Sequence, residues 1–118
     1  MIKTKEIGLR SYRWWVDYLG EKKERRVNHN TKVSLSWEDN IIISLHGTDI
    51  LVISPLDRYM YNTGGFSTLT TKRRMNELGP LTIAQHNWNW LCNKNHQWGE
   101  YRDGIIVDEY CYEKQSLI

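Results

Sequence analysis

The chain has 118 residues, of which 40% are hydrophobic and 25% are charged, and its formal net charge is +2. These values are typical of one soluble folded domain, and the charge is too small to imply a nucleic-acid partner by itself. No stretch approaches the about 20 apolar residues of a membrane-spanning helix, and the N-terminus lacks the apolar run of a secretory signal, so we expect a cytoplasmic protein with no membrane partner.

The first segment, residues 9–28, fits two structures. Alternation at period two, with many aromatic and β-branched side chains, favours a hairpin whose return strand covers residues 22–27. Helical spacing instead gives one apolar stripe, made of Tyr12, Trp15, Val16 and Leu19. We favour the hairpin and leave the helix open.

The return strand of this hairpin is basic, with Lys22, Lys23, Arg25 and Arg26. On a solvated edge strand, such charges discourage edge-to-edge aggregation. Beside Trp14 and Trp15 they could instead contact phosphates on a surface where bases stack. The four cations are therefore the candidate site if the partner is a nucleic acid.

Residues 32–53 predict three strands, at 32–37, 41–45 and 49–53. The last two are rich in β-branched residues and are joined by three residues that include Gly47, which is hairpin chemistry. Their continuous apolar runs suggest a central position in the sheet with both faces covered.

Residues 58–80 contain the clearest local signals. A strand at 58–61 runs into a turn with Gly64 and Gly65, and a helix at about 69–78 follows, capped by a threonine and ended by Gly79 in the left-handed conformation. Three residues share the face that should pack on the sheet: Thr71, Met75 and Leu78.

The remaining chain predicts a strand from residue 81 to 90, which would place His86, Trp88 and Trp90 on one side, and short strands at 98–102 and 105–107. The fold class is therefore α+β, with a small antiparallel sheet of about six strands and one short helix (about 69–78) packed on it. We divide the chain into an N-terminal hairpin or helix extension at 1–27, a core domain at 28–107 and a tail at 108–118.

No catalytic constellation is visible. The histidines do not have zinc-ligand spacing, no serine lies in a nucleophile elbow, and three aspartates fall at turns: Asp49, Asp57 and Asp103. Cys92 and Cys111 fit reduced, partly buried thiols better than a disulfide framework. We therefore expect no catalytic residues, no metal and no cofactor.

Two features could bind a ligand. Glycines before a helix N-terminus resemble an anion site, although P-loop spacing is incomplete and a plain turn with a cap is the alternative. Aromatic residues on one strand face could stack a base, unless that face is buried or lies between subunits. The candidate ligand-binding residues are Gly64, Gly65, Thr71, Lys72, Arg73, Arg74, His86, Trp88 and Trp90.

Four stretches of the chain resemble a family of small bacteriophage proteins. They are residues 45–50 (LHGTDI), 62–76 (NTGGFSTLTTKRRMN), 85–90 (QHNWNW) and 101–105 (YRDGI). The family's central block is Gly-Gly-(Trp/Phe)-x-Thr-x-Thr-Thr-Lys-x-Arg-Met-Asn, and this chain has Phe66 where tryptophan is usual. The resemblance covers about residues 28–107 and implies a phage origin and a compact domain, but it supplies no catalytic residues.

A small phage protein without a catalytic constellation would act by binding. Our leading hypothesis is a non-enzymatic homo-oligomer in the cytoplasm of the infected host, which counters host defence by sequestering a nucleotide-type signal or by occluding a host protein. The alternative is a nucleic-acid-binding accessory protein of phage replication or transcription. A nuclease or ring-nucleotide hydrolase that uses His46 and Asp49 is a third possibility.

Overall fold

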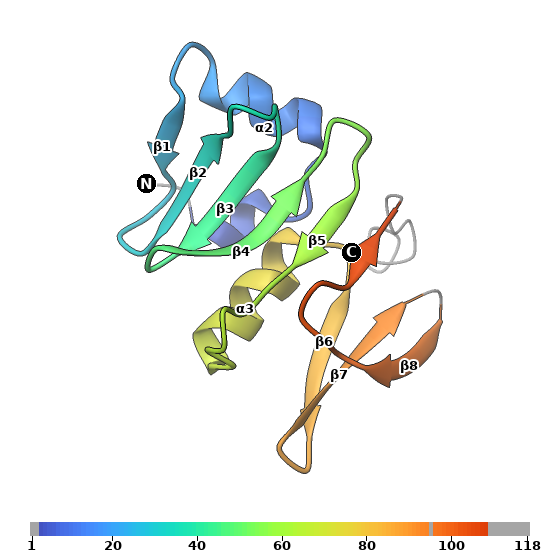
Figure 1. Cartoon of the computed structure of the whole chain (residues 1–118). Coiled ribbons are helices and arrows are strands. Elements are labelled where there is room, and N and C mark those ends of the chain that lie inside the picture. Colours follow the sequence, from blue (N-terminus) through green and yellow to red (C-terminus); the bar gives the residue numbers. More distant parts are fainter. Residues whose placement is uncertain (1–2, 95, 109–118) are drawn as a thin grey trace.

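The computed structural model describes residues 3–94 and 96–108. These residues form a six-stranded antiparallel sheet, a separate three-stranded antiparallel sheet and three helices (Figure 1), which confirms the α+β class. The elements are α1 (Thr4–Ile7), α2 (Tyr12–Leu19), β1 (Glu24–Arg26), β2 (Thr31–Leu35), β3 (Ile41–Leu45), β4 (Thr48–Ile53), β5 (Tyr59–Tyr61), α3 (Leu69–Leu78), β6 (Thr82–His86), β7 (Asn89–Lys94), β8 (Gln97–Glu100) and β9 (Ile106–Val107).

The large sheet has the strand order β1-β2-β3-β4-β5-β9. The predicted β3–β4 hairpin is confirmed, and its turn consists of His46 and Gly47, both with positive φ (51° and 84°). Two consecutive positive φ values match the right-handed twist of the flanking strands. A register shift between Ile43 and Ser44 lets the successive residues Ile50 and Leu51 both point into the core.

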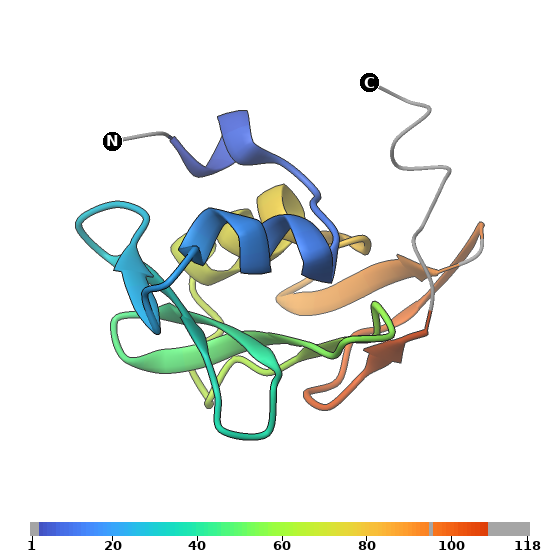
Figure 2. The ribbon, with the colours of Figure 1, turned by 90° about the horizontal axis from the view of Figure 1, so that it is seen from above.

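The three helices lie on one face of the large sheet, and the opposite face is open (Figure 2). The expectation that β3 and β4 are covered on both faces is therefore wrong. Ile41 and Ile43 are fully buried under the helices, whereas Ile42 and Val52 point the other way and are only partly buried. Antiparallel sheets tolerate this arrangement because their outer face can be solvated.

The favoured hairpin in residues 9–28 is wrong for its first half, which is the helix α2. The Ser11 hydroxyl accepts a hydrogen bond from the Trp14 amide and so caps the helix. Trp15 and Leu19 lie on the helical stripe and are 0% and 3% exposed. Burial of this stripe outweighs the intrinsic strand preference of the aromatic residues, which depends strongly on context.

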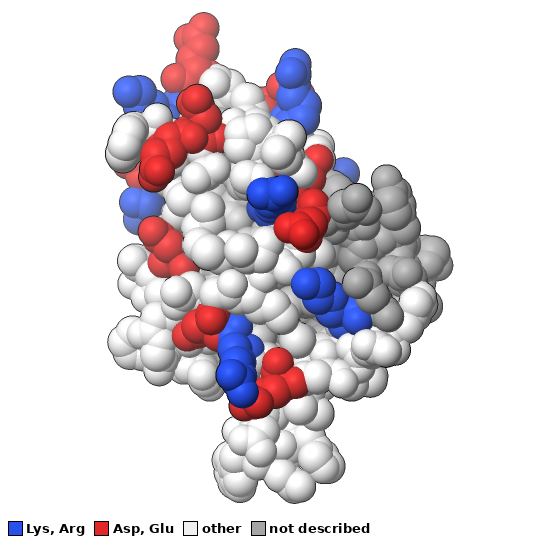
Figure 3. Space-filling model, turned by 45° about the vertical axis from the view of Figure 1, so that its right-hand side comes forward, with Lys and Arg blue, Asp and Glu red and all other residues white. Residues whose placement is uncertain are grey.

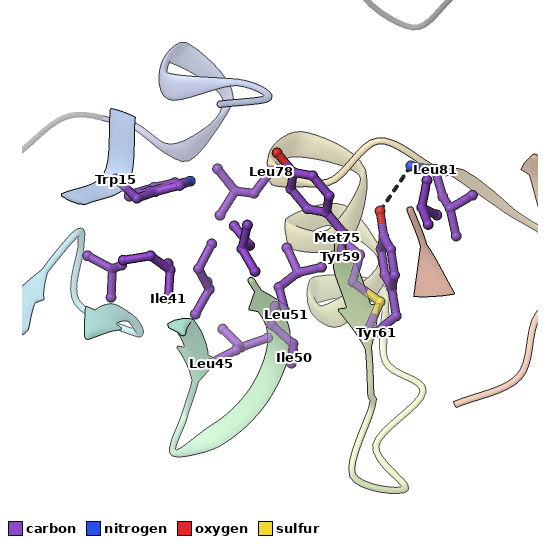
Figure 4. Close-up of a cluster of buried hydrophobic side chains, with 14 of the residues drawn as sticks. Trp15, Ile41, Leu45, Ile50, Leu51, Tyr59, Tyr61, Met75, Leu78 and Leu81 are labelled. Carbon is purple, nitrogen blue, oxygen red and sulfur yellow. Dashed lines mark hydrogen bonds between the residues drawn. The ribbon is translucent and has the colours of Figure 1, made fainter. Parts of the chain in front are cut away.

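The hydrophobic core lies between the helices and the large sheet (Figure 4), and it includes residues from both sides of the predicted boundary at residue 27. Trp15 comes from α2, Leu51 from β4, and Met75 and Leu78 from α3. Of the predicted tail, only Asp108 belongs to the described residues.

Helix α3 has the predicted bounds and the predicted packing face. The Thr68 hydroxyl accepts from the Thr71 amide at its start. Gly79 ends the helix with φ −115°, so the expected left-handed conformation is wrong. Glycine is needed there for another reason: a Cβ on Gly79 would lie 2.8 Å from Cζ of Tyr61, whose hydroxyl accepts from the Leu81 amide (Figure 4).

The second sheet corrects the predicted strand at residues 81–90. Asn87 and Trp88 have φ values of 50° and 69° and form a two-residue turn between β6 and β7. The sequence signal for this turn is weak because a bulky residue such as Trp rarely adopts positive φ. The hairpin that results projects away from the large sheet (Figure 1).

Candidate anion-binding site

The side chain of Arg74 links three separate parts of the fold. Its Nε donates to Thr31 Oγ1 (2.9 Å), and Nη1 donates to Thr4 Oγ1 (2.8 Å) and to Glu77 Oε1 (2.9 Å). Its Nη2 donates to Asn30 Oδ1 (3.1 Å). The guanidinium therefore holds α1 and the start of β2 against α3.

The acceptors around Arg74 are themselves well ordered by hydrogen bonds. Thr4 Oγ1 accepts from Arg74 and donates to Glu77 Oε1 at 2.8 Å, so both hydrogen-bonding functions of the hydroxyl are used. The Arg74 and Glu77 side chains are only 11% and 15% exposed. This largely buried, hydrogen-bonded ion pair forms a rigid floor for the surface between α1 and α3.

A hollow of about 600 Å³ lies over this floor, and we call it the α1–α3 hollow. Its lining residues are Lys3, Thr4, Lys5, Asn28, His29, Arg73, Arg74 and Glu77. Arg74 and Glu77 neutralise each other, and the exposed cations Lys3, Lys5 and Arg73 have no carboxylate partner among the described residues. The α1–α3 hollow therefore has a net positive charge.

A second hollow of about 500 Å³ lies on the open face of the large sheet, and we call it the sheet-face hollow. It is lined by Arg26, His29, Asn30, Lys32, Ser34, Ser36, Ile42, Ser44, His46, Gly47 and Asp49. Asp49 Oδ1 accepts a hydrogen bond from Ser44 Oγ at 2.8 Å. This hollow combines cations and hydroxyl groups with one carboxylate.

The Gly64–Gly65 turn lies at the N-terminal end of α3, whereas Arg73 and Arg74 lie in the middle of that helix and line the α1–α3 hollow. The Gly64 amide donates to Asn62 Oδ1, and the Gly65 amide donates to Thr63 Oγ1. These two amides are therefore used within the protein.

The other predicted residues of α3 have different surroundings. Thr71 is 3% exposed and its hydroxyl contacts that of Thr68 at 3.0 Å. Lys72 lines neither of the two hollows, although it is adjacent to Arg73 in sequence. Of the three consecutive cations, Arg73 alone combines exposure with a place in the α1–α3 hollow.

The predicted shared face of His86, Trp88 and Trp90 is wrong, because the chain turns between them. Trp88 is 90% exposed at the tip of the β6–β7 hairpin. Trp90 is 8% exposed, with its ring 5.4 Å from that of Tyr101, and it pairs with Gln85 while His86 pairs with Asn89. Neighbouring positions along a strand point to opposite faces, so His86 and Trp90 are on different faces.

Of the four cations predicted on the return strand, Arg25 and Arg26 lie in the edge strand β1, and both make contacts within the protein. Arg25 lies 4.3 Å from the ring centroid of Tyr18 and donates to the Tyr18 carbonyl at 2.7 Å, while Arg26 donates to the His29 carbonyl at 3.0 Å. Trp14 stacks on Tyr18 with centroids 5.4 Å apart, and Arg10 lies 4.9 Å from Trp14. These aromatic faces are thus covered largely by protein groups.

Asp103, which is 40 positions after Thr63 in the chain, holds the start of the Gly64–Gly65 turn in place by hydrogen bonds to Thr63. Its carboxylate accepts from the Thr63 amide and hydroxyl (both 2.8 Å) and from the Tyr101 hydroxyl (2.8 Å). Partial burial acts to raise the pKa of Asp103, but the three hydrogen bonds outweigh it and the pKa lies below its usual value. Burial raises the pKa of Tyr101, and so does its hydrogen bond to Asp103.

Other polar residues were also candidates for chemistry. Within residues 3–94 and 96–108, no three His, Cys, Asp or Glu side chains gather as a metal site would require. Cys92 is a buried free thiol whose pKa is raised by burial, and Cys111 lies outside the described residues.

On the face of the molecule shown in Figure 3, positively and negatively charged side chains alternate. The tip of the β6–β7 hairpin, at the bottom of this view, carries no charged side chain on this face.

Sequence reasoning missed Lys3, Lys5, Asn28 and His29 as neighbours of Arg73. No short-range pattern connects them, because the contact between Thr4 and Glu77 spans 73 positions.

The model of a protein family described as Kyanoviridae Gp96 protein matches residues 6–108. No curated protein and no solved structure matches the chain. In the part of the chain that is described, no helix is long and apolar enough to cross a membrane.

Proposed function

The chain belongs to the Kyanoviridae Gp96 protein family, a family of phage proteins, and from this premise we propose a binding function in the infected host. In this proposal the protein is not an enzyme. It counters host defence by sequestering a nucleotide-type signal, whose phosphate lies in the α1–α3 hollow.

The observation that carries the proposal is the uncompensated charge of the α1–α3 hollow. Arg73 offers a planar fork of N–H donors that suits phosphate oxygens, and Lys3 and Lys5 add point charges. The volume of about 600 Å³ lies within the range of about 300–1,000 Å³ that is usual for small-molecule sites.

The lining groups favour binding over turnover. Glu77 is the carboxylate of this hollow, and it accepts hydrogen bonds from Arg74 and Thr4. A carboxylate held in this way stabilises the hollow, whereas a general base needs a geometry that reaches the substrate proton.

Titration calorimetry with a panel of mononucleotides, dinucleotides and ADP-ribose derivatives tests the proposal. We expect at least one phosphate-bearing ligand to bind, Arg73→Ala to weaken its binding about tenfold or more, and Lys72→Ala to change it little. The Lys72 variant is the matched control because it removes the same charge from the same helix outside the hollow. If no ligand of the panel gives a binding heat, the proposal that the protein sequesters a nucleotide is refuted.

Incubation of the protein with a labelled form of the bound ligand separates binding from catalysis. If a labelled ligand is converted, and the turnover is lost in His46→Ala or Asp49→Ala, the protein is an enzyme and the non-enzymatic proposal fails. If the ligand is recovered unchanged, the proposal holds.

A version in which the protein occludes a host protein is favoured by one observation, the exposure of Trp88. A Trp that is 90% exposed at a hairpin tip can fill a partner's pocket, and Trp is enriched at binding hot spots. A host protein that binds the wild type but not Trp88→Ala would support this version. Equal binding of the two would exclude Trp88 as the anchor.

The nucleic-acid alternative depends on β1, whose three residues are all exposed. Lys22 and Lys23 precede the strand and are exposed as well. This function requires an affinity that falls steeply with salt, because neutralised phosphates release counterions. Salt-independent binding would exclude it.

A further inference from the structure

The α1–α3 hollow and the sheet-face hollow are separated by the turn between β1 and β2. His29, in that turn, lines both hollows, while its neighbours Asn28 and Asn30 each line one. The two hollows therefore adjoin at His29. We propose that the two hollows form one bipartite site, whose ligand carries two phosphate groups separated by a nucleoside. This inference rests on the proposed function and narrows its ligand class to dinucleotides.

The turn that carries His29 is held in place from several sides. Asn28 Oδ1 accepts from the amides of Asn30 and Thr31, both at 3.0 Å. Arg26 Nη1 donates to the His29 carbonyl, and Arg74 Nη2 donates to Asn30 Oδ1. These bonds fix the turn before a ligand arrives, which reduces the entropy lost on binding.

The first phosphate belongs in the α1–α3 hollow. There Lys3, Lys5 and Arg73 are exposed and have no carboxylate partner among the described residues, so an anion meets no competing negative charge except the already paired Glu77. A mononucleotide should therefore bind here and leave the other hollow empty.

The second phosphate belongs at the Arg26 and Lys32 side of the sheet-face hollow. Lys32 Nζ is paired with Glu24 at 2.8 Å, but both side chains are about half exposed (44% and 58%). An exposed pair of this kind is weak, so the ammonium can turn to a phosphate at little cost.

The sugar that follows the second phosphate has matching partners, because Ser34 and Ser36 lie beyond Lys32 along the chain from the turn. Asp49 repels phosphate but accepts hydrogen bonds from hydroxyl groups, as it does from Ser44. Ser34 and Ser36 also line this hollow and can both donate and accept. A ribose next to Asp49 uses these groups, which are of no benefit to inorganic phosphate alone.

The experiment compares three probes on the full chain by titration calorimetry: adenosine 5′-monophosphate, the linear 5′-phosphorylated diadenylate pApA, and a 12-residue oligodeoxyadenylate. We expect pApA to bind about tenfold or more tightly than the mononucleotide, because a second phosphate engages an arginine or lysine.

Variants then assign each phosphate to a hollow. Arg73→Ala should weaken both the mononucleotide and pApA about tenfold. Lys32→Gln should weaken pApA by a similar factor and leave the mononucleotide unchanged. Lys22→Ala and Lys72→Ala, which remove cations outside both hollows, should change neither affinity.

Three results would overturn the inference, and they differ in what they say of the proposed function. If Arg73→Ala weakens both ligands and Lys32→Gln weakens neither, the hollows are independent but the proposed function stands. If neither adenosine 5′-monophosphate nor pApA binds the wild type, the bipartite site fails, and the wider ligand panel decides the proposed function. If the oligodeoxyadenylate binds far more tightly than pApA and steeply with salt, the partner is a nucleic acid.

Discussion

Replacing Arg74 with methionine removes the guanidinium from the interface of α1, α3 and β2 but keeps an unbranched stem of similar length. The change deletes four hydrogen bonds and one side of the ion pair with Glu77. Thr4 and the Glu77 carboxylate would keep their mutual bond, while Thr31 and Asn30 would lose a donor.

The size of the effect follows from burial. Removing one partner of a buried ion pair costs about 3–5 kcal/mol, because the remaining charge is left without compensation. Since Glu77 is 15% exposed, water can reach it in part, and we expect the low end, about 3 kcal/mol. For a chain of this size, that loss lowers the melting temperature by about 10 °C or more.

Urea and thermal unfolding, followed by circular dichroism, measure the change. Arg73→Met is the matched control, because it removes the same charge from the adjacent, exposed position and should alter stability by less than about 0.5 kcal/mol. The double variant Arg74→Met/Glu77→Gln should regain part of the loss, because the uncompensated carboxylate is gone. Equal midpoints for Arg73→Met and Arg74→Met would refute the reasoning.

Three further predictions concern a glycine, a carboxylate and the assembly. Gly79→Ala should destabilise the protein by about 1–3 kcal/mol in urea unfolding, since its Cβ collides with Tyr61, whereas Gly99→Ala, with nothing within 4 Å of the added Cβ, should not show this collision cost. Asp103 has a lowered pKa in the folded state, so the stability it contributes is complete above its unfolded pKa of about 3.9 and is lost as pH falls through the lower folded value. Asp103→Asn should therefore remove that part of the acid sensitivity, and an unchanged pH profile would contradict it. Native mass spectrometry of protein taken from cells should show a homo-oligomer with a phosphate-bearing ligand, and a bare monomer would contradict both expectations.

Some elements could be predicted because their signals are local. Helix α3 has its expected bounds because Thr68, the glycine at its end and the apolar spacing of Met75 and Leu78 all act within a few residues. The β3–β4 hairpin follows equally from β-branched runs around Gly47. Membership of a phage family was also expected from the sequence, whereas the detailed pattern of its central block stays a prediction.

Other elements depended on distant partners. Residues 12–19 carry both strand and helix periodicity, and packing of α2 against β2 and β3, with Trp15 and Leu19 in the core, decides for the helix. The strand expected at 81–90 is broken by a turn whose Trp88 carries almost no sequence signal for positive φ.

Local sequence determined that three cations, Lys72, Arg73 and Arg74, follow one another on a helix whose packing face could be predicted. Only the tertiary structure decided their different surroundings. Arg74 makes its hydrogen bonds inside the protein, and Arg73 lines the α1–α3 hollow. Lys72 lies outside both hollows. The physical reason is that α1, some 70 positions earlier in the chain, packs against α3 and brings Lys3, Thr4 and Lys5 to the site. Helical periodicity determines on which face of the helix a side chain lies. The element that packs against that face determines whether the side chain is buried in a hydrogen-bond network or lines a hollow.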